Sequence, residues 1–150
     1  MVRDRRAAAI AARLRAEIAA ARNELAIEID ANLRAATPVD TGHARANWVP
    51  SIGSPAMAEV GGGAAHDAGV VAVLGAKLTD DVYVSNNAPY LGRLIGGSSV
   101  QAPAGWDLEA IDRAVQAVQQ RHDGLSIDVS AGGTGATVTI TPRATANEDA

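Results

Sequence analysis

The sequence predicts an α+β fold in which a long N-terminal helix packs with a small mixed or antiparallel sheet and two further helices, followed by a C-terminal β-hairpin. Three observations support this. Apolar residues recur at helical spacing before residue 37, two short alternating segments lie in the middle of the chain, and two more lie near its end, separated by glycines. At 150 residues, the chain has the length of one domain. We expect that domain to cover residues 1–142.

The N-terminal helix is predicted over residues 4–36. Its larger apolar residues recur at steps of four and seven, which places them on one side of a helix: Ile10, Leu14, Ile18, Leu25, Ile29 and Leu33. Thr37-Pro38 ends the helix, because proline disfavours helical geometry in the residue before it. A helix of this length spans about 50 Å at 1.5 Å per residue. That exceeds what a small domain can cover, so part of the apolar stripe is expected to project from the body or to meet another subunit.

Residues 37–123 are predicted to form the α/β body. Two strands are expected, at 48–52 and at 82–86. Pro50 indicates that the first of them lies at an edge or a bulge. Between the strands, residues 64–78 are predicted to form a helix.

A second helix of the body is expected to begin at Asp107, as the capping residue, and to run to about His122. Its buried face is predicted to be Ile111, Val115 and Val118. Gly124 stands where a residue that terminates a helix is typical. Residues 89–95 are expected to form one or two further helical turns.

The end of the chain differs in pattern from the rest. Apolar and polar residues alternate on both sides of a glycine-rich stretch at 132–135, which predicts a β-hairpin over residues 125–142 with a loose turn. Residues 143–150 are expected to be disordered.

Composition and charge exclude several classes of function. The chain has no cysteine, which excludes disulfides and thiolate metal sites. No apolar run approaches the roughly 20 residues that a membrane span needs. Residues 1–36 contain seven arginines and five acids, whereas residues 37–150 contain six Lys or Arg and twelve acids. Proteins that grip duplex DNA usually have a basic face, so tight DNA binding is not expected. The Arg-rich start is interpreted as a solvated helix face or as a contact for an acidic partner.

Catalytic and cofactor motifs are scarce. No two of the three histidines stand at metal-ligand spacing, and they are expected to be solvated at the surface. The glycine clusters lack the Lys-Ser/Thr of a phosphate-binding loop. We therefore expect no metal, no cofactor and no enzymatic activity. The four aromatic residues, Trp48, Tyr83, Tyr90 and Trp106, are expected to anchor the core or an interface.

One catalytic alternative stays open. Asp40-Thr41-Gly42 is the tripeptide of retroviral-type aspartic proteases, in which two subunits each supply one carboxylate. Leu91-Gly92-Arg93 is similar to a later segment of those enzymes. A hydrophobic strand should lead into the aspartate, however, and here a long helix and Thr37-Pro38 precede it. An Asp-containing turn explains the same three residues.

Three polar, Pro- and Gly-containing clusters have a joint pattern. They are Thr-Pro-Val-Asp-Thr-Gly at 37–42, followed by Arg45 and Trp48; Ser-Asn-Asn-Ala-Pro-Tyr at 85–90; and Ser-x-x-Gln-Ala-Pro-Ala-Gly at 98–105. Their order and spacing, with the long helix before them, resemble the tail-completion and neck proteins of long-tailed bacteriophages, the lambda minor tail protein Z-like and HK97 gp10-like family. The resemblance covers about residues 5–122. It departs at 94–96, where the family often has an acidic residue, and the hairpin lies outside it.

The resemblance implies a structural virion protein without catalytic activity, assembled in the host cytoplasm. Such proteins form a ring, usually of six copies, at the head-proximal end of the tail. Its partners would be the tail tube or tail terminator protein and the head connector or stopper protein, with duplex DNA passing through the lumen without specific binding. A tail terminator ring is the alternative within this class. A helix-mediated binding module with a protein partner is another reading of the chain.

Ten residues of the clusters are the candidates for shaping loops and interfaces: Asp40, Thr41, Gly42, Arg45, Trp48, Asn86, Tyr90, Gln101, Pro103 and Gly105. Asp40 and Arg45 flank the Gly42 turn, and we expect them to brace it, within one subunit or between two. Asn86 and Gln101 are expected to satisfy backbone groups of the 98–105 loop.

Overall fold

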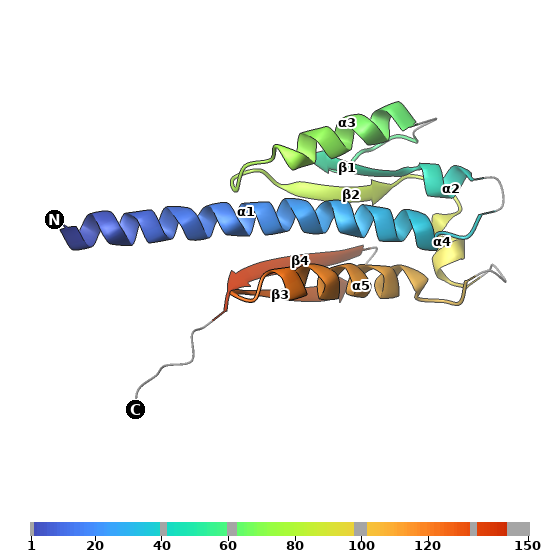
Figure 1. Cartoon of the computed structure of the whole chain (residues 1–150). Coiled ribbons are helices and arrows are strands. Elements are labelled where there is room, and N and C mark those ends of the chain that lie inside the picture. Colours follow the sequence, from blue (N-terminus) through green and yellow to red (C-terminus); the bar gives the residue numbers. More distant parts are fainter. Residues whose placement is uncertain (1, 40–41, 60–62, 98–101, 133–134, 144–150) are drawn as a thin grey trace.

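A computed structural model describes residues 2–39, 42–59, 63–97, 102–132 and 135–143, and Figure 1 shows its arrangement. The fold is α+β, as predicted, with two antiparallel two-stranded sheets. The elements in chain order are α1 Val2–Ala36, α2 His43–Ala46, β1 Trp48–Ile52, α3 Gly63–Leu74, β2 Val82–Asn86, α4 Leu91–Ile95, α5 Trp106–Arg121, β3 Leu125–Gly132 and β4 Gly135–Pro142.

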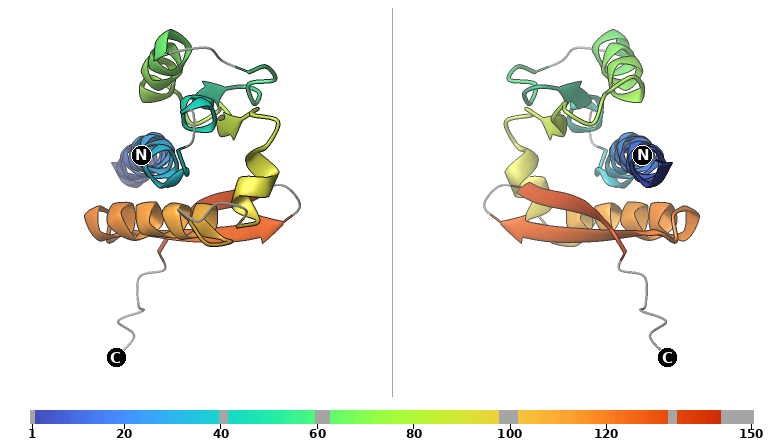
Figure 2. Two further views of the ribbon diagram at one scale, coloured as in Figure 1. Left: turned by 90° about the vertical axis from the view of Figure 1, so that its right-hand side faces the viewer. Right: turned by 90° about the vertical axis from the view of Figure 1, so that its left-hand side faces the viewer.

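Helix α1 lies between two layers (Figures 1 and 2). One layer contains β1, β2 and α3, and the other contains α5 and the β3–β4 hairpin; both layers contact α1. The apolar core lies mainly on the α5 side. There Leu25, Ile29 and Leu33 of α1 pack in one buried cluster with α5 and the first part of β3.

The two sheets have the predicted strands. β1 pairs with β2 from Trp48 opposite Asn86 to Ile52 opposite Val82, and Pro50 stands opposite Val84. Because β2 is the one strand that pairs with β1 in the described chain, Pro50 is on an edge strand, where its missing N–H is tolerated. The hairpin pairs from Leu125 opposite Pro142 to Gly132 opposite Gly135.

The first half of α1 projects from the body, as its length led us to expect (Figure 1). No residue of α1 before Ala21 is buried. Ile10 of the predicted apolar stripe is 61% exposed, whereas Leu25 and Leu33 of the same stripe are buried. The helix also starts slightly earlier than predicted, at Val2, and ends at Ala36 as predicted.

Helix α3 is shorter than predicted, because it ends at Leu74 and not at residue 78. Residues 77–80 form a turn in which Asp80 Oδ2 accepts a hydrogen bond from the Lys77 N–H at 2.8 Å. Arg22 of α1 donates to the carbonyls of Lys77 at 2.7 Å and of Asp80 at 2.6 Å. A long-range contact from α1 therefore fixes this turn. Helix propensity within residues 64–78 could not reveal that contact.

The capping prediction for α5 was wrong. Gly105, in the left-handed conformation with φ +85°, is the N-cap residue, and Asp107 lies in the first helical turn. A left-handed backbone favours glycine, which explains Gly105 at this position. At the other end the helix finishes at Arg121, and Gly124 does not have the positive φ of a helix-terminating glycine.

The hairpin is held at its base. The N–H of Arg143 donates to the carbonyl of Gly124 at 2.8 Å, so Arg143 continues the ordered backbone that was expected to end at residue 142. Residues 144–150, the rest of the segment expected to be disordered, lie outside the described residues.

Gly69 of α3 permits the close approach of α3 to β1. A Cβ at this position would lie 2.1 Å from the carbonyl oxygen of Pro50, which is backbone and cannot rotate away. We expect Gly69→Ala to lower the free energy of unfolding by about 1–3 kcal/mol, because α3 must move off the strand. Urea denaturation measures this. Gly75→Ala is the matched control, since its added Cβ meets nothing closer than 3.8 Å; an equal effect of both variants would contradict the close approach.

Candidate functional site

The described parts of the three clusters lie near the C-terminal end of α1 (Figure 1). Helix α2 follows the first cluster, α4 follows the second, and α5 follows the third. Of the ten candidate residues, Asp40, Thr41 and Gln101 lie outside the described residues. The expected brace between Asp40 and Arg45 and the expected role of Gln101 are therefore not described.

The first cluster folds back on the end of α1. The side chain of Thr37 donates to the Leu33 carbonyl and accepts the indole N–H of Trp48 at 2.8 Å. Thr37 and Trp48 are both buried, so this hydrogen bond is shielded from water. Arg45 donates to the carbonyls of Ala35 at 3.4 Å and Thr37 at 3.3 Å. Trp48 and Arg45 thus satisfy the polar groups at the end of α1, where carbonyls lack helical partners.

Gly42 supplies the sharp turn before α2. Its φ of +81° is left-handed, and its carbonyl accepts the N–H of Ala46. The turn expected at this glycine is present, but the short helix that follows it was not predicted.

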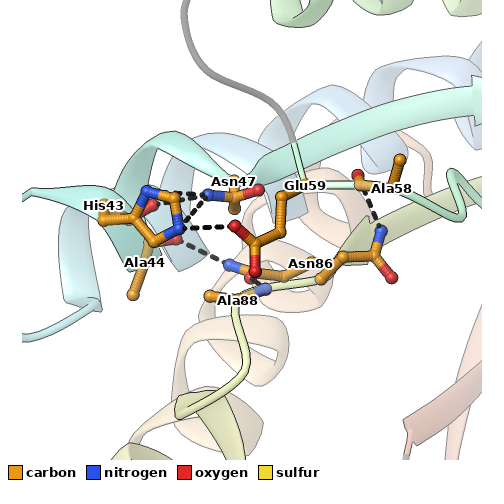
Figure 3. A network of polar contacts seen from close by, with 8 residues as sticks. His43, Ala44, Asn47, Ala58, Glu59, Asn86 and Ala88 are labelled. Carbon is orange, nitrogen blue, oxygen red and sulfur yellow. Dashed lines mark hydrogen bonds and ion pairs between the residues drawn. The ribbon is translucent and has the colours of Figure 1, made fainter.

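Asn86, at the end of β2, joins the first cluster to the second (Figure 3). Its Nδ2 donates to the Ala44 carbonyl at 2.7 Å, and its Oδ1 accepts the N–H of Ala88 at 2.9 Å. We expected Asn86 to serve the 98–105 loop, and that was wrong. Asn86 lies opposite α2 and next to the turn that follows β2, so its side-chain amide can bind a backbone group of each. These two bonds fix α2 against β2.

A polar network extends from α2 to the segment after β1 (Figure 3). His43 Nε2 lies 3.2 Å from a carboxylate oxygen of Glu59, and Asn47 contacts the same imidazole at 3.3 Å. Asn87 donates to the Ala56 carbonyl at 2.6 Å. The ring of Tyr90 lies 6.1 Å from the His43 ring, centroid to centroid. These contacts order a segment that has no regular secondary structure of its own.

The described part of the third cluster packs on α4. The N–H of Gly105 donates to the Ile95 carbonyl, and the indole N–H of Trp106 donates to the Leu94 carbonyl at 2.9 Å. Trp106 is buried, whereas Pro103 is exposed. The third cluster therefore contacts the helix that follows the second, and Pro103 and Ala104 face solvent.

Each of the three histidines meets a carboxylate. The expectation of solvated surface histidines was wrong for His66 and His122, whose side chains are 16% and 17% exposed, whereas the His43 side chain is 38% exposed. His66 Nε2 lies 2.5 Å from Asp30, and His122 Nε2 lies 2.9 Å from Glu24. Sequence reasoning missed these pairs because their members are 36 and 98 residues apart. Among the residues that the structure describes, no group of three or more His, Cys, Asp or Glu is arranged to hold a metal ion.

Two of these carboxylates have shifted pKa values in opposite directions. Burial raises the pKa of the Asp30 carboxyl, and the hydrogen bond from His66 opposes that shift. The hydrogen bond from His122 lowers the pKa of the Glu24 carboxyl, and Arg121 adds to this effect. Glu24 thus forms an ion pair with Arg121 and a hydrogen bond with His122 between α1 and α5, whereas burial disfavours the ionised form of Asp30.

None of the helices in the described ranges combines the length and the apolar composition that crossing a bilayer requires. Comparison with known proteins finds no matching family model, no matching curated protein and no matching solved structure. A proposal about function must therefore draw on the residues and the geometry of the chain itself.

Asn86 offers a test of the network. Asn86→Ala removes two hydrogen bonds and leaves the Ala44 carbonyl without its side-chain donor. We expect the free energy of unfolding to fall by about 1–3 kcal/mol. Urea denaturation measures the loss, with Ser130→Ala on the exposed part of β3 as the control that should change it by less than about 0.5 kcal/mol. If the two variants were equally stable, Asn86 would not be fixing α2 against β2.

Proposed function

We propose that this chain is a structural virion protein of a long-tailed bacteriophage or a phage-like particle. Copies of it form a ring, hexameric in this proposal, at the head-proximal end of the tail. The ring completes the tail and docks it to the head connector or stopper protein. On its other side it meets the tail tube or the tail terminator protein, and duplex DNA passes through its lumen.

The observation that carries this proposal is the arrangement of α1. The described parts of the three loop clusters whose sequence resembles tail-completion proteins lie near its C-terminal end, and its N-terminal half projects from the body (Figure 1). One rigid helix thus connects two different surfaces. A closed ring of identical subunits requires two different complementary surfaces on each subunit, held at a fixed angle.

The loops are suited to a docking surface. Their backbone shape is set by Gly42 and Gly105 in the left-handed conformation, and by side chains that bind backbone carbonyls and N–H groups, such as Asn86 and Trp106. A surface that is already ordered loses little conformational entropy when it binds a partner. Such preorganisation favours a repeated, permanent contact in a particle.

The charge distribution supports the passage of DNA without binding. Residues 37–150 have six basic and twelve acidic residues. A wall of negative potential repels phosphates, whereas a basic wall would bind them and release counterions. In the proposed ring the acidic body surrounds the lumen.

The proposal predicts the phenotype of particles that lack the chain. Deleting its coding sequence from the genome that carries it should yield DNA-filled heads and tails of normal length that fail to join. Electron microscopy of the lysate measures this directly. Expression of the intact chain from a second locus should restore joined, infectious particles, which controls for effects on neighbouring genes. Infectious particles that form without the chain would contradict the proposal.

A further inference from the structure

A groove of about 470 Å³ lies between α1 and α3. Helix α3 lies on the side of α1 that faces away from α5 (Figure 2). Ile27, Asp30 and Arg34 line it from α1, and His66, Val70 and Val71 line it from α3. The groove is distinct from the loop clusters at the end of α1, and the proposed contacts with tail and head proteins do not use it. Its lining combines apolar side chains with three charged groups, Asp30, Arg34 and the exposed Asp67.

Two of the charged groups in the groove each have one buried polar atom without a hydrogen-bond partner in the described chain. Asp30 is 3% exposed, and one of its carboxylate oxygens, Oδ2, binds His66. Its other oxygen, Oδ1, and Arg34 Nη1 are buried and have no hydrogen-bond partner among the described residues. Folded proteins rarely leave a buried carboxylate oxygen unsatisfied. Within the chain, the hydrogen bond from His66 and the charge of Arg34 on the same helix both oppose the rise in the Asp30 pKa, and a donor from a partner would satisfy the remaining oxygen, Oδ1.

Helix α3 has the composition of a buried helix but is largely exposed. Its sequence, Gly-Ala-Ala-His-Asp-Ala-Gly-Val-Val-Ala-Val-Leu, is apolar on nearly every side, and Val73 is its one buried residue. Val71 and Leu74 are 71% and 62% exposed. A helix that is apolar all round is normally covered. We therefore expect a partner surface over α3 and the groove beside it.

The projecting half of α1 has the properties that such a partner needs. Residues 2–20 contain five arginines and two acids, with Ile10 exposed among many alanines. The small alanine side chains allow a close approach of two helix backbones, and the arginines supply donors for Asp30. At 1.5 Å per residue these 19 residues span about 28 Å, enough to cover the 12 residues of α3.

The covering helix must come from another copy. Ile10 and Ile27 belong to the same continuous helix, and their separation of 17 positions places Ile10 about 25 Å from the groove. Within one chain, the projecting half cannot fold back to α3 without breaking α1.

We propose that residues 2–20 of α1 in one copy dock in the α1–α3 groove of a neighbouring copy, where an arginine of the docked helix donates to Asp30 Oδ1. Donor and acceptor surfaces differ, so the contact is head to tail and can close a ring at a suitable angle. The inference rests on the proposed function, because it names the contact between subunits of the proposed ring.

Engineered cysteines test this contact, since the native chain has none. Full-length Ile10→Cys and full-length Val71→Cys, one of them with an added affinity tag, are mixed and oxidised. Both side chains are exposed, so folding should be unaffected. Docking holds the two thiols at a high effective concentration, and we expect the mixed dimer to form at least about tenfold more than in the control mixture. The control pairs Ile10→Cys with Leu108→Cys, which is 43% exposed on α5, across α1 from α3.

The role of Asp30 is tested in the same assay. Asp30→Asn in the Val71→Cys chain should lower the yield of mixed dimer severalfold, because the neutral side chain no longer pairs with an arginine. Asp123→Asn, at an exposed position, should leave the yield unchanged. Equal yields from these two variants would overturn the arginine contact.

The outcomes separate this inference from the proposed function. A yield at the level of the Leu108 control would overturn the docking of α1. The same low yield is expected if a water molecule alone occupies the groove. If heads and tails still fail to join when the chain is deleted, the ring proposal then stands, and the subunits of the ring must meet through a different contact. Particles that join without the chain would remove the ring proposal, whatever the cross-link shows.

Discussion

The fold depends on one constraint: two small layers must both be buried against the same stretch of α1, from Ala21 to Ala36. A two-stranded sheet is at best marginally stable by itself, and among the described residues each sheet has two strands. The two faces of α1 meet this requirement differently. Toward α5, Leu25, Ile29 and Leu33 exclude water in the main apolar cluster. Toward α3, polar side chains bind backbone carbonyls and an imidazole; Asn23, for example, is buried and donates to the Ala76 carbonyl at 2.8 Å.

This difference explains which parts of the structure the sequence could predict. The α5 side follows from apolar spacing and alternation, so the long helix and the hairpin were predicted. Alternation also predicted β1 and β2 on the α3 side, and Pro38 predicted the end of the long helix. The α3 side depends on Arg22, Asn23 and Asp30, whose partners are more than 30 residues away. Periodicity does not identify such partners, because polar residues at these positions look like a solvated face. The shorter α3 and the paired histidines have the same cause.

The candidate site divides in a similar way. Glycine, proline and asparagine mark where the backbone turns, so Gly42, Trp48 and Asn86 could be selected from the sequence as residues that shape loops. The groups that these side chains bind could not be predicted from the sequence, since Asn86 reaches Ala44 through the antiparallel pairing of β1 and β2. The proposed ring uses both halves of α1. Residues 21–36, which both layers contact, set the angle of the loop surface. The projecting half, residues 2–20, supplies an apolar, basic surface that is largely exposed in the described chain.

Amide hydrogen exchange along α1 tests this division most directly. The chain is diluted in steps until the exchange rates no longer change, so that contacts between copies are absent, and exchange is then measured by mass spectrometry. Residues 21–36 should exchange only as fast as the whole chain unfolds. Residues 2–16, which precede the contact of Glu17 with His122 at 3.9 Å, should exchange orders of magnitude faster, because none of them is buried. Uniform slow exchange along the whole helix would show that the first half is covered within one chain, and would contradict the account.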